Sequence, residues 1–522
     1  MNVREVLEQY PAFREDLFIR GFLVTDRTDI QTEEFPFYGA WHARRVSGLQ
    51  CMWHAKTGAH FYESDKICLF LFGHAYNPFT MQADEQEILA RLAKHWETDF
   101  YECLNELTGL FVLGVIADGA LTFVTDASGM QSAACGMVDG YFYLSSHAQM
   151  IADICDLETD EYVKELVAYR WYGRVLGPYL PADLTPFRGV KRVVPNQAYT
   201  YHGASVTHKR FYPISALPEH QTAKQYRAAI EQGAEILRRS MRLVSQKWEK
   251  PRISLTGGID SNTTFAAACG MYDKFETFSY LASEKERVDC EAAKHISERF
   301  SVPWTLYRVP EKNDEIPLFE EKKAVLMHTN GYVAATPDHE LRKRMVLREQ
   351  FVGEVEVKSW VSETVRGYWY KHCGRKSMPA LSPKLYRNLY KIFICDRGLA
   401  HRTDQAFAKY LEEYEYASIP ARYLPADLHF WEIVWGSWGS LNVNEMKYYA
   451  DITVIYNNRK FLDLMLGVPL DARIADAHHL DMKKLLNREL WDMNVRVINA
   501  KETKARALLL NTLFTVNTLL PF

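Results

Sequence analysis

Hydrophobic and polar positions in the first 210 residues alternate over short runs, as they do in β-strands. Gly, Asp and Asn separate these runs, as turns require. The clearest runs lie at 68–73, 110–116, 121–126, 140–146, 191–195 and 198–202. Asp118-Gly119, between the second and third runs, predicts a hairpin turn. Apolar spacings of three and four predict helices at 84–97 and 159–172, so we expect an α+β unit.

The pattern changes after 212–226, a segment with two prolines and little periodicity that we interpret as a linker. A long amphipathic helix is then predicted over 223–244. Strands and helices alternate beyond it: a strand that ends in a turn is predicted at 252–258, further strands at 275–281 and 304–309, and helices at 261–271 and 288–300. This alternation is typical of a parallel sheet built from right-handed βαβ units. After about residue 315 the pattern is mostly helical.

Composition narrows the class of protein. The chain has 522 residues, enough for about two to four domains, and a net charge of -4, which predicts no general affinity for nucleic acid or anionic membrane. Its nine cysteines include no C-x-x-C pair, which argues against a zinc ribbon or a disulfide framework. We find no secretory signal and no apolar run near the roughly 18 residues of a membrane span. We therefore expect a cytoplasmic protein with reduced thiols.

The turn that follows the first strand of the second half carries residue types suited to phosphate. Its candidate ligand-binding residues are Thr256, Gly257, Gly258, Asp260 and Ser261. The glycines allow close backbone approach, the helix N-terminus attracts anions, and the hydroxyl groups can donate to phosphate oxygens. Asp260 is suited to a magnesium ion that bridges phosphates. The alternative is a plain strand–turn–helix junction with Ser261 or Asn262 as the helix N-cap.

The string "LTGGIDSNTT" (255–264) resembles the SGGxDS pyrophosphate loop of the ATP pyrophosphatase superfamily, with Thr256 replacing the first serine. Segments of the first half are similar, in the same order, to motifs of the asparagine synthetase family: "LFGHAYNP" (71–78), "TDASGMQSAAC" (125–135), "SSHAQMI" (145–151) and "TPFRGVKRVVPNQAYTYH" (185–202). The resemblance implies a glutaminase-like β-sandwich at 1–212. It implies an α/β PP-loop synthetase domain at 213–522, with a largely helical C-terminal part.

The same resemblance implies an activity. Members of this family adenylate a carboxylate with ATP and Mg²⁺, release pyrophosphate, and let a nitrogen nucleophile displace AMP to form an amide. The backbone of the first two strands places the adenine-binding candidates at Ser254, Leu255, Ser279 and Leu281. The implied partners are small-molecule or peptide carboxylate and amine substrates, with no nucleic acid, no membrane and a possible homodimer.

Two departures from the family pattern bear on the chemistry. Glutamine-dependent members carry a nucleophilic cysteine directly after the initiator Met, whereas this chain has Asn2 and no cysteine before Cys51. The first domain therefore resembles a glutaminase that has lost its chemistry, as in β-lactam synthetases and lasso-peptide cyclases. The family's "GxDELFGGY" segment is matched best by "WVSETVRGYW" (360–369), where Ser362 replaces the usual aspartate.

The second segment supplies further candidates. Glu363 is the candidate second metal ligand beside Asp260, and Arg366 can face phosphates or the acyl group. The alternative is a helix N-terminus capped by Ser362. Asp289 and Glu291 resemble an acidic pair of the family and can contact a substrate amine or cap a helix.

In several members of the family, a lysine in the closing helical segment neutralises charge in the acyl-adenylate transition state. Its approximate place in 456–486 is taken by His479 and Lys483, with His478, Lys484 and Arg459 as weaker candidates. Basic residues on late helices are more often surface residues. Three functions stay open: an amide ligase that does not use glutamine, an intramolecular cyclase of the lasso-peptide or β-lactam type, and a pseudoenzyme scaffold that retains ATP binding.

Overall fold

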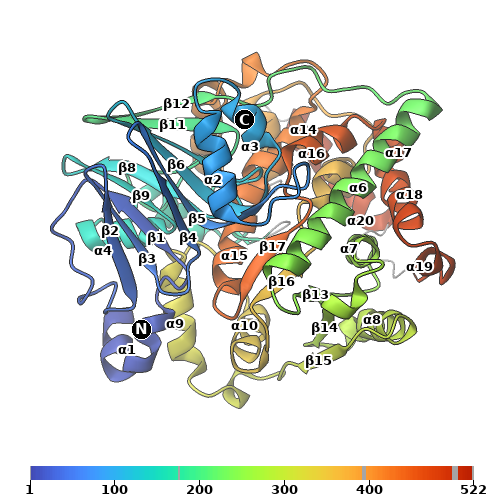
Figure 1. Ribbon diagram of the computed structural model, residues 1–522, viewed down its shortest axis with the longest axis horizontal. Helices are drawn as coiled ribbons and strands as arrows, with labels where there is room; N and C mark the ends of the chain where they lie inside the picture. Colours follow the sequence, from blue (N-terminus) through green and yellow to red (C-terminus); the bar gives the residue numbers. More distant parts are fainter. Residues whose placement is uncertain (1, 174–176, 391–395, 496–503, 520–522) are drawn as a thin grey trace.

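The protein, seen in a computed structural model that describes residues 2–173, 177–390, 396–495 and 504–519, contains three β-sheets (Figure 1). Two antiparallel six-stranded sheets occupy the first 210 residues, and one parallel five-stranded sheet lies in the second half. The strands of the first sheet, in spatial order, are β10 (Val190–Arg192), β8 (Ala134–Val138), β9 (Tyr141–Ser145), β1 (Phe22–Thr25), β3 (Leu49–His54) and β2 (Trp41–Val46). Those of the second are β12 (Ser205–Arg210), β11 (Gln197–His202), β7 (Ala120–Thr125), β6 (Thr108–Ala117), β5 (Ile67–Tyr76) and β4 (Ala59–Glu63).

The two antiparallel sheets pack face to face as a sandwich. Aromatic rings meet between them: Phe22 stacks on Phe72 with ring centroids 4.9 Å apart, and Phe142 stacks on Tyr201 at 4.2 Å. The predicted hairpin is confirmed, because β6 and β7 pair across Asp118-Gly119 and both turn residues have positive φ, 50° and 74°. The strands β1 to β4, β8 and β12 were not predicted, since their apolar runs are short or interrupted by polar residues.

The parallel sheet has the strand order β15 (Trp304–Arg308), β14 (Glu276–Leu281), β13 (Arg252–Ser254), β16 (Val355–Lys358) and β17 (Asp451–Val454). All four neighbouring pairs are parallel, as the alternation of strands and helices predicted for the first three strands. β16 and β17 lie within the region that was predicted to be mostly helical. They place the carboxyl ends of five strands along one edge, where ligands of parallel sheets bind.

Helices cover the sheets and fill most of the second half. Those of the first half are α1 (Val3–Gln9), α2 (Glu85–Lys94), α3 (Phe100–Asn105), α4 (Ala148–Cys155) and α5 (Glu161–Ala168). The second half begins with α6 (Ala223–Lys247), α7 (Ile259–Ala267), α8 (Arg287–Arg299), α9 (Phe319–Thr329), α10 (Asp338–Gln350), the 3₁₀ helix η5 (Ser362–Arg366), α11 (Tyr368–Cys373) and α12 (Pro383–Tyr390). It continues with α13 (Arg397–Glu413), α14 (Pro425–Leu428), the π-helix η7 (His429–Gly439), α15 (Ser440–Met446), α16 (Arg459–Leu466), α17 (Leu470–Ile474), α18 (Ala477–Leu486), α19 (Arg488–Asp492) and α20 (Lys504–Leu519).

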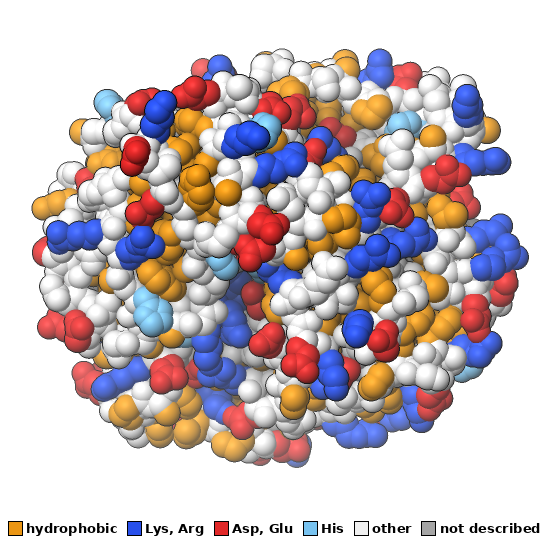
Figure 2. Space-filling view, in the orientation of Figure 1, with side chains coloured by type: hydrophobic (Ala, Val, Ile, Leu, Met, Phe, Trp, Pro, Cys, Tyr) orange, Lys and Arg blue, Asp and Glu red, His pale blue; other side chains and the backbone are white. Residues whose placement is uncertain are grey.

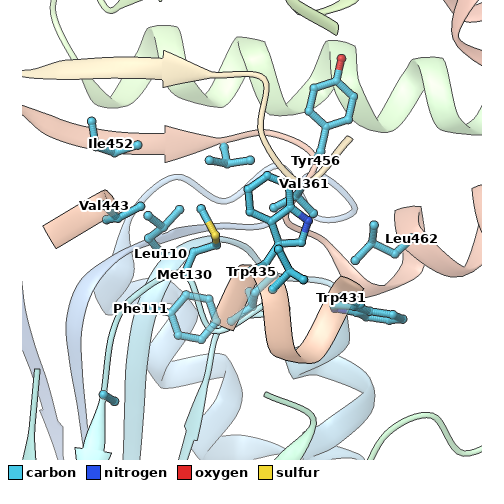
Figure 3. Packing of buried hydrophobic residues seen from close by; sticks show 14 of the residues in the cluster. Leu110, Phe111, Met130, Val361, Trp431, Trp435, Val443, Ile452, Tyr456 and Leu462 are labelled. Atoms are coloured by element: carbon cyan, nitrogen blue, oxygen red, sulfur yellow. The ribbon is translucent and has the colours of Figure 1, made fainter. Parts of the chain in front are cut away.

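The two halves share a continuous core. Phe111 and Met130 of the sandwich lie in one cluster with Trp435 and Ile452 of the second half (Figure 3). The sandwich strands end at Arg210 and α6 begins at Ala223, on either side of the predicted boundary at 212–213. Because the core crosses this boundary, the sandwich holds the parallel sheet in a defined position.

A buried ion pair reinforces this junction. Arg210 at the end of β12 donates to both carboxylate oxygens of Glu432 in η7, at 2.7 and 3.0 Å. The two side chains are 4% and 0% exposed. On the outside, acidic and basic side chains are interspersed over the face in Figure 2, with basic side chains gathered in a hollow near its centre. Within the described ranges, no helix has the length and apolar character needed to cross a membrane.

Candidate functional site

The predicted phosphate loop lies between β13 and α7, at the carboxyl edge of the parallel sheet. Its conformation is fixed by its own polar groups. The Thr256 and Ser261 hydroxyl oxygens lie 2.9 Å apart, the Gly258 amide donates to Thr256 Oγ1 at 3.1 Å, and Asn262 Nδ2 donates to the Thr256 carbonyl at 2.9 Å. The N-cap of α7 is Gly258, so the alternative with Ser261 or Asn262 as N-cap is wrong. A glycine cap leaves the helix N-terminus open toward a ligand.

A carboxylate from the next βα unit holds the loop from the other side. Asp289, in the first turn of α8, accepts a hydrogen bond from the Gly257 amide at 3.0 Å. Burial raises the pKa of Asp289 above its usual value. Glu291, its predicted partner, is exposed on the same helix. Of this acidic pair, the structure brings only Asp289 to the loop.

A cavity of about 330 Å³ opens directly above the loop. The predicted residues that line it are Ser254, Leu255, Thr256, Gly258, Asp260, Ser261, Ser279 and Glu363. The predicted adenine-binding residue Leu281 is not among the lining residues. The Ser279 hydroxyl donates to the Leu255 carbonyl at 2.8 Å and accepts from Trp304 Nε1 at 3.1 Å, so it braces the two strand ends.

Asp260 is tied to a buried cluster of charged residues. Its carboxylate accepts from Ser362 Oγ at 2.7 Å and from Arg366 Nη1 at 2.5 Å. Arg366 also donates two hydrogen bonds to Asp476, at 2.7 and 3.1 Å, and Lys371 contacts the same carboxylate. Although burial opposes it, Arg366 and Lys371 hold the pKa of Asp476 well below its usual value. The cluster therefore pairs the carboxylates of Asp260 and Asp476 with two basic side chains, Arg366 and Lys371.

The donor set around the loop fits a magnesium ion that also binds phosphate. Asp260 and Glu363 both line the cavity of about 330 Å³. A carboxylate has about four acceptor sites, so Asp260 keeps capacity beyond the bonds from Ser362 and Arg366. In the described part of the chain, the one group of three potential ligands is His95, Asp99 and Cys103, away from the loop. Magnesium here would take its other ligands from phosphate oxygens and water.

The late basic candidates lie behind the loop, on α18. His479 Nε2 is 3.7 Å from Asp260 Oδ1, and burial, followed by the charge of Arg366, lowers its pKa to about 3. Lys483 Nζ is 3.4 Å from Asn262 Oδ1, and burial lowers its pKa to about 8. Neither side chain lines the cavity above the loop. His479 is therefore neutral at pH 7 and supports Asp260 from below.

The weaker late candidates are scattered. Lys484 is exposed on α18, and His478 is buried beside His479 with its pKa well below the usual value because of burial. Arg459 donates to Asn196 Oδ1 at 2.8 Å, at the junction with the sandwich. The structure brings none of these three to the loop.

A second cavity, of about 1000 Å³, adjoins the first. The residues that line both cavities are Tyr280, Lys358, Trp360 and Glu363. Arg366 and Asp476 line the larger cavity, together with aromatic side chains such as Tyr368 and Trp438. Lys358 and Trp360 were missed because Lys358 ends β16 and Trp360 follows it, and the sequence pattern did not reveal this strand. Glu363 therefore stands where the two cavities meet.

The start of the chain lies outside the sandwich. Asn2 is the N-cap of α1, and its side chain accepts from the Arg4 amide at 3.0 Å. The first strand, β1, begins only at Phe22. The first cysteine, Cys51, is fully buried in β3, and burial raises the pKa of its thiol to about 12. Neither residue offers a thiolate nucleophile at neutral pH.

Comparisons with known proteins add little information about the family or fold of this chain. No family model and no curated sequence matches the chain. Among solved structures, glutamine phosphoribosylpyrophosphate amidotransferase from B. subtilis with ADP and GMP is similar at 11% identity and a TM-score of 0.23, over 70% of this chain and 74% of that one. An allosteric regulatory enzyme of purine biosynthesis is similar at 10% identity and a TM-score of 0.25, over 56% of this chain and 76% of that one. Glutamine-dependent NAD+ synthetase from Acinetobacter baumannii with ADP is similar at 12% identity and a TM-score of 0.19, over 51% of this chain and 63% of that one. These TM-scores are too low to establish a shared fold.

Proposed function

We propose that this protein is an ATP- and magnesium-dependent ligase that adenylates a carboxylate and lets an amine displace AMP, without hydrolysing glutamine. One observation carries the proposal. The loop from Thr256 to Ser261 forms the floor of a cavity of about 330 Å³, and this cavity opens into one of about 1000 Å³ past Glu363. A reaction between a nucleotide and a second, larger substrate needs two adjoining compartments of this kind.

The smaller cavity has the features that a bound triphosphate requires. The open N-terminus of α7 and the exposed side chain of Thr256 face the place for phosphate oxygens. Asp260 and Glu363 would hold magnesium, which screens phosphate charge when bound. Ser362 and Arg366 orient the Asp260 carboxylate, so this acid is positioned before any ligand arrives.

The larger cavity would hold the carboxylate and the amine. Carboxylate oxygen is a poor leaving group and AMP is a good one, so the acyl group must meet the α-phosphate where the cavities join. Lys358, which is 8% exposed and pairs with the buried Glu356 at 2.7 Å, lines both cavities beside Glu363. A fixed cation at this place stabilises the negative charge that develops during acyl transfer. Trp360 on the same wall helps to exclude water from the acyl-adenylate.

The proposal that the nitrogen does not come from glutamine rests on Asn2 and Cys51, neither of which offers a thiolate nucleophile. Asn2 caps an outer helix, and Cys51 is buried with a raised pKa. The volume of about 1000 Å³ lies at the upper limit of pockets for drug-sized ligands, about 300–1000 Å³. This size favours a peptide segment as substrate, so intramolecular cyclisation of a peptide is the second candidate reaction.

Calorimetric titration of the protein with ATP tests the first step. We expect binding that requires Mg²⁺ and that weakens at least tenfold in Asp260→Asn, because one magnesium ligand loses its charge. The matched control is Asp273→Asn, whose side chain is 72% exposed away from the loop. ATP–pyrophosphate exchange with a panel of carboxylates and peptides then identifies the acyl substrate. No binding of ATP by the unmodified protein would contradict the proposal, and binding without any exchange would favour a scaffold.

A further inference from the structure

A small cavity of about 70 Å³ lies at the junction of the two halves, apart from the site above. The sandwich contributes residues of β8 and β10 and the start of α4, and the second half contributes residues of α9, η7 and α15. Among the described residues that line it, Arg192 of β10 is the one charged side chain. The part of the wall formed by described residues thus presents one positive charge and is otherwise uncharged.

Arg192 is buried, and most of its hydrogen-bonding capacity is unused. The residue is 8% exposed, and its Nη2 donates to the Ala182 carbonyl at 3.1 Å. Its Nε and Nη1 are buried and have no hydrogen-bond partner. Across the described ranges Arg192 forms no ion pair, and the neighbouring Asp183 is engaged by Lys191 at 3.0 Å and by the Tyr414 hydroxyl at 3.0 Å.

Two further buried polar atoms without a hydrogen-bond partner belong to the lining residues of the same cavity. They are Nε2 of His147, before α4, and Oδ1 of Asn444 in α15. Burial, followed by the charge of Lys447, lowers the pKa of His147 to about 3, so its ring is neutral at pH 7. His147 therefore adds polarity but no charge, and the net charge of the described lining residues is that of Arg192.

A buried cation without a counter-ion is unfavourable, and an uncharged water molecule satisfies its hydrogen bonds but not its charge. A single water needs about 10–15 Å³ of such space, so about 70 Å³ accepts a small ion and excludes a nucleotide or a peptide. We propose that this cavity binds one small inorganic anion of halide size against the Arg192 guanidinium. The anion would join the sandwich to the second half independently of the proposed ligase activity.

Thermal unfolding at constant ionic strength tests this proposal, with chloride replaced stepwise by gluconate, which is too large for the cavity. Above its dissociation constant, each tenfold increase in chloride is expected to raise Tm by about 1 °C for a chain of this length. Arg192→Met should abolish the response. Arg45→Met, which removes an exposed arginine from β2, should keep it.

Crystals soaked in bromide provide a test that needs no variant. Anomalous scattering is expected to place bromide beside Arg192. A cavity that holds water alone would overturn the proposal. Bromide beside Arg192 without any chloride dependence of Tm would show an adventitious ion only and would overturn it as well, as would an equal chloride response in Arg192→Met and the unmodified protein.

Discussion

Replacement of Arg366 by methionine is the most direct test of the charged cluster beneath the phosphate loop. The change removes the hydrogen bond to Asp260 at 2.5 Å and the two to Asp476 at 2.7 and 3.1 Å. Methionine fills much of the same space without charge. Asp476 then keeps Lys371 as its one remaining cationic partner in this cluster, and Asp260 loses the cation that orients it.

The cost can be estimated from burial. Removing one partner of a buried ion pair typically costs about 3–5 kcal/mol. The side chains of Arg366 and Asp476 are 9% and 10% exposed, but Asp260 is 23% exposed and partly hydrated. Because Lys371 still compensates Asp476, we expect the lower end of this range. Arg366→Met should therefore lower the free energy of unfolding by about 3 kcal/mol at pH 7.

The difference should depend on pH. The pKa of Asp476 is depressed in the folded protein, so its contribution is complete above the unfolded value of 3.8 and is lost as pH falls toward the folded value. Between pH 5 and pH 3 the gap between the two proteins should narrow by at most about 1 kcal/mol, because Lys371 still pairs with Asp476 in the variant.

Urea unfolding followed by tryptophan fluorescence measures both effects. Arg402→Met is the control, because Arg402 pairs with Glu165 on the surface, where the side chains are 37% and 55% exposed, and should cost less than about 1 kcal/mol. A loss at pH 7 no larger than that of the control would refute the reasoning, as would a gap that does not change with pH.

Three further substitutions test other parts of the structure. Glu432→Gln leaves Arg210 buried without its counter-ion and should cost about 3–5 kcal/mol in urea unfolding, most of which the double replacement Arg210→Met with Glu432→Leu should restore. Lys483→Met should remove a rise in stability of about 3 kcal/mol between pH 8 and pH 10.5, because the unfolded lysine binds the proton more tightly than the folded one in that window. Gly114→Ala places a Cβ atom 2.0 Å from Phe70 Cζ and should lower stability by about 1–3 kcal/mol, measured as a shift of the urea midpoint.

Each of these changes has a matched control. Glu412→Gln removes an exposed acid, Lys484→Met an exposed lysine of the same helix as Lys483, and Gly173→Ala adds a methyl group with no atom within 4 Å. All three controls should stay within about 0.5 kcal/mol of the unmodified protein. If a control and its test variant lose equal stability, the named contact is not the cause.

The sequence pattern predicted the elements whose periodicity is local. The hairpin at Asp118-Gly119 and the βα units around the phosphate loop follow from alternation, glycine and apolar spacing. β16 escaped detection because its four residues include Glu356 and Lys358, which are buried with their charges paired to each other at 2.7 Å. No local pattern reports such a pair, so the cavity residues Lys358, at the end of β16, and Trp360, just after it, were missed as well.

The long-range contacts of the site residues could not be predicted from the sequence either. Family resemblance pointed to Glu363 and Arg366, and the structure places Glu363 on the cavity above the loop. The bond from Arg366 to Asp476 joins residues 110 positions apart, and Asp476 gave no signal of its own. Contacts of this kind depend on how helices pack, which short-range spacing does not encode.

The shape of the larger cavity depends on the number of residues in the π-helix η7. Its hydrogen bonds span one residue more than those of an α-helix, and Trp438 near its end lines the cavity while Gly436 packs against Arg192. Deleting one residue from this helix would favour an α-helix and rotate all later positions by about 100°. Trp438 would then leave the cavity wall without being mutated. A single-codon deletion would therefore change the shape of the larger cavity, while the loop from Thr256 to Ser261 keeps its geometry.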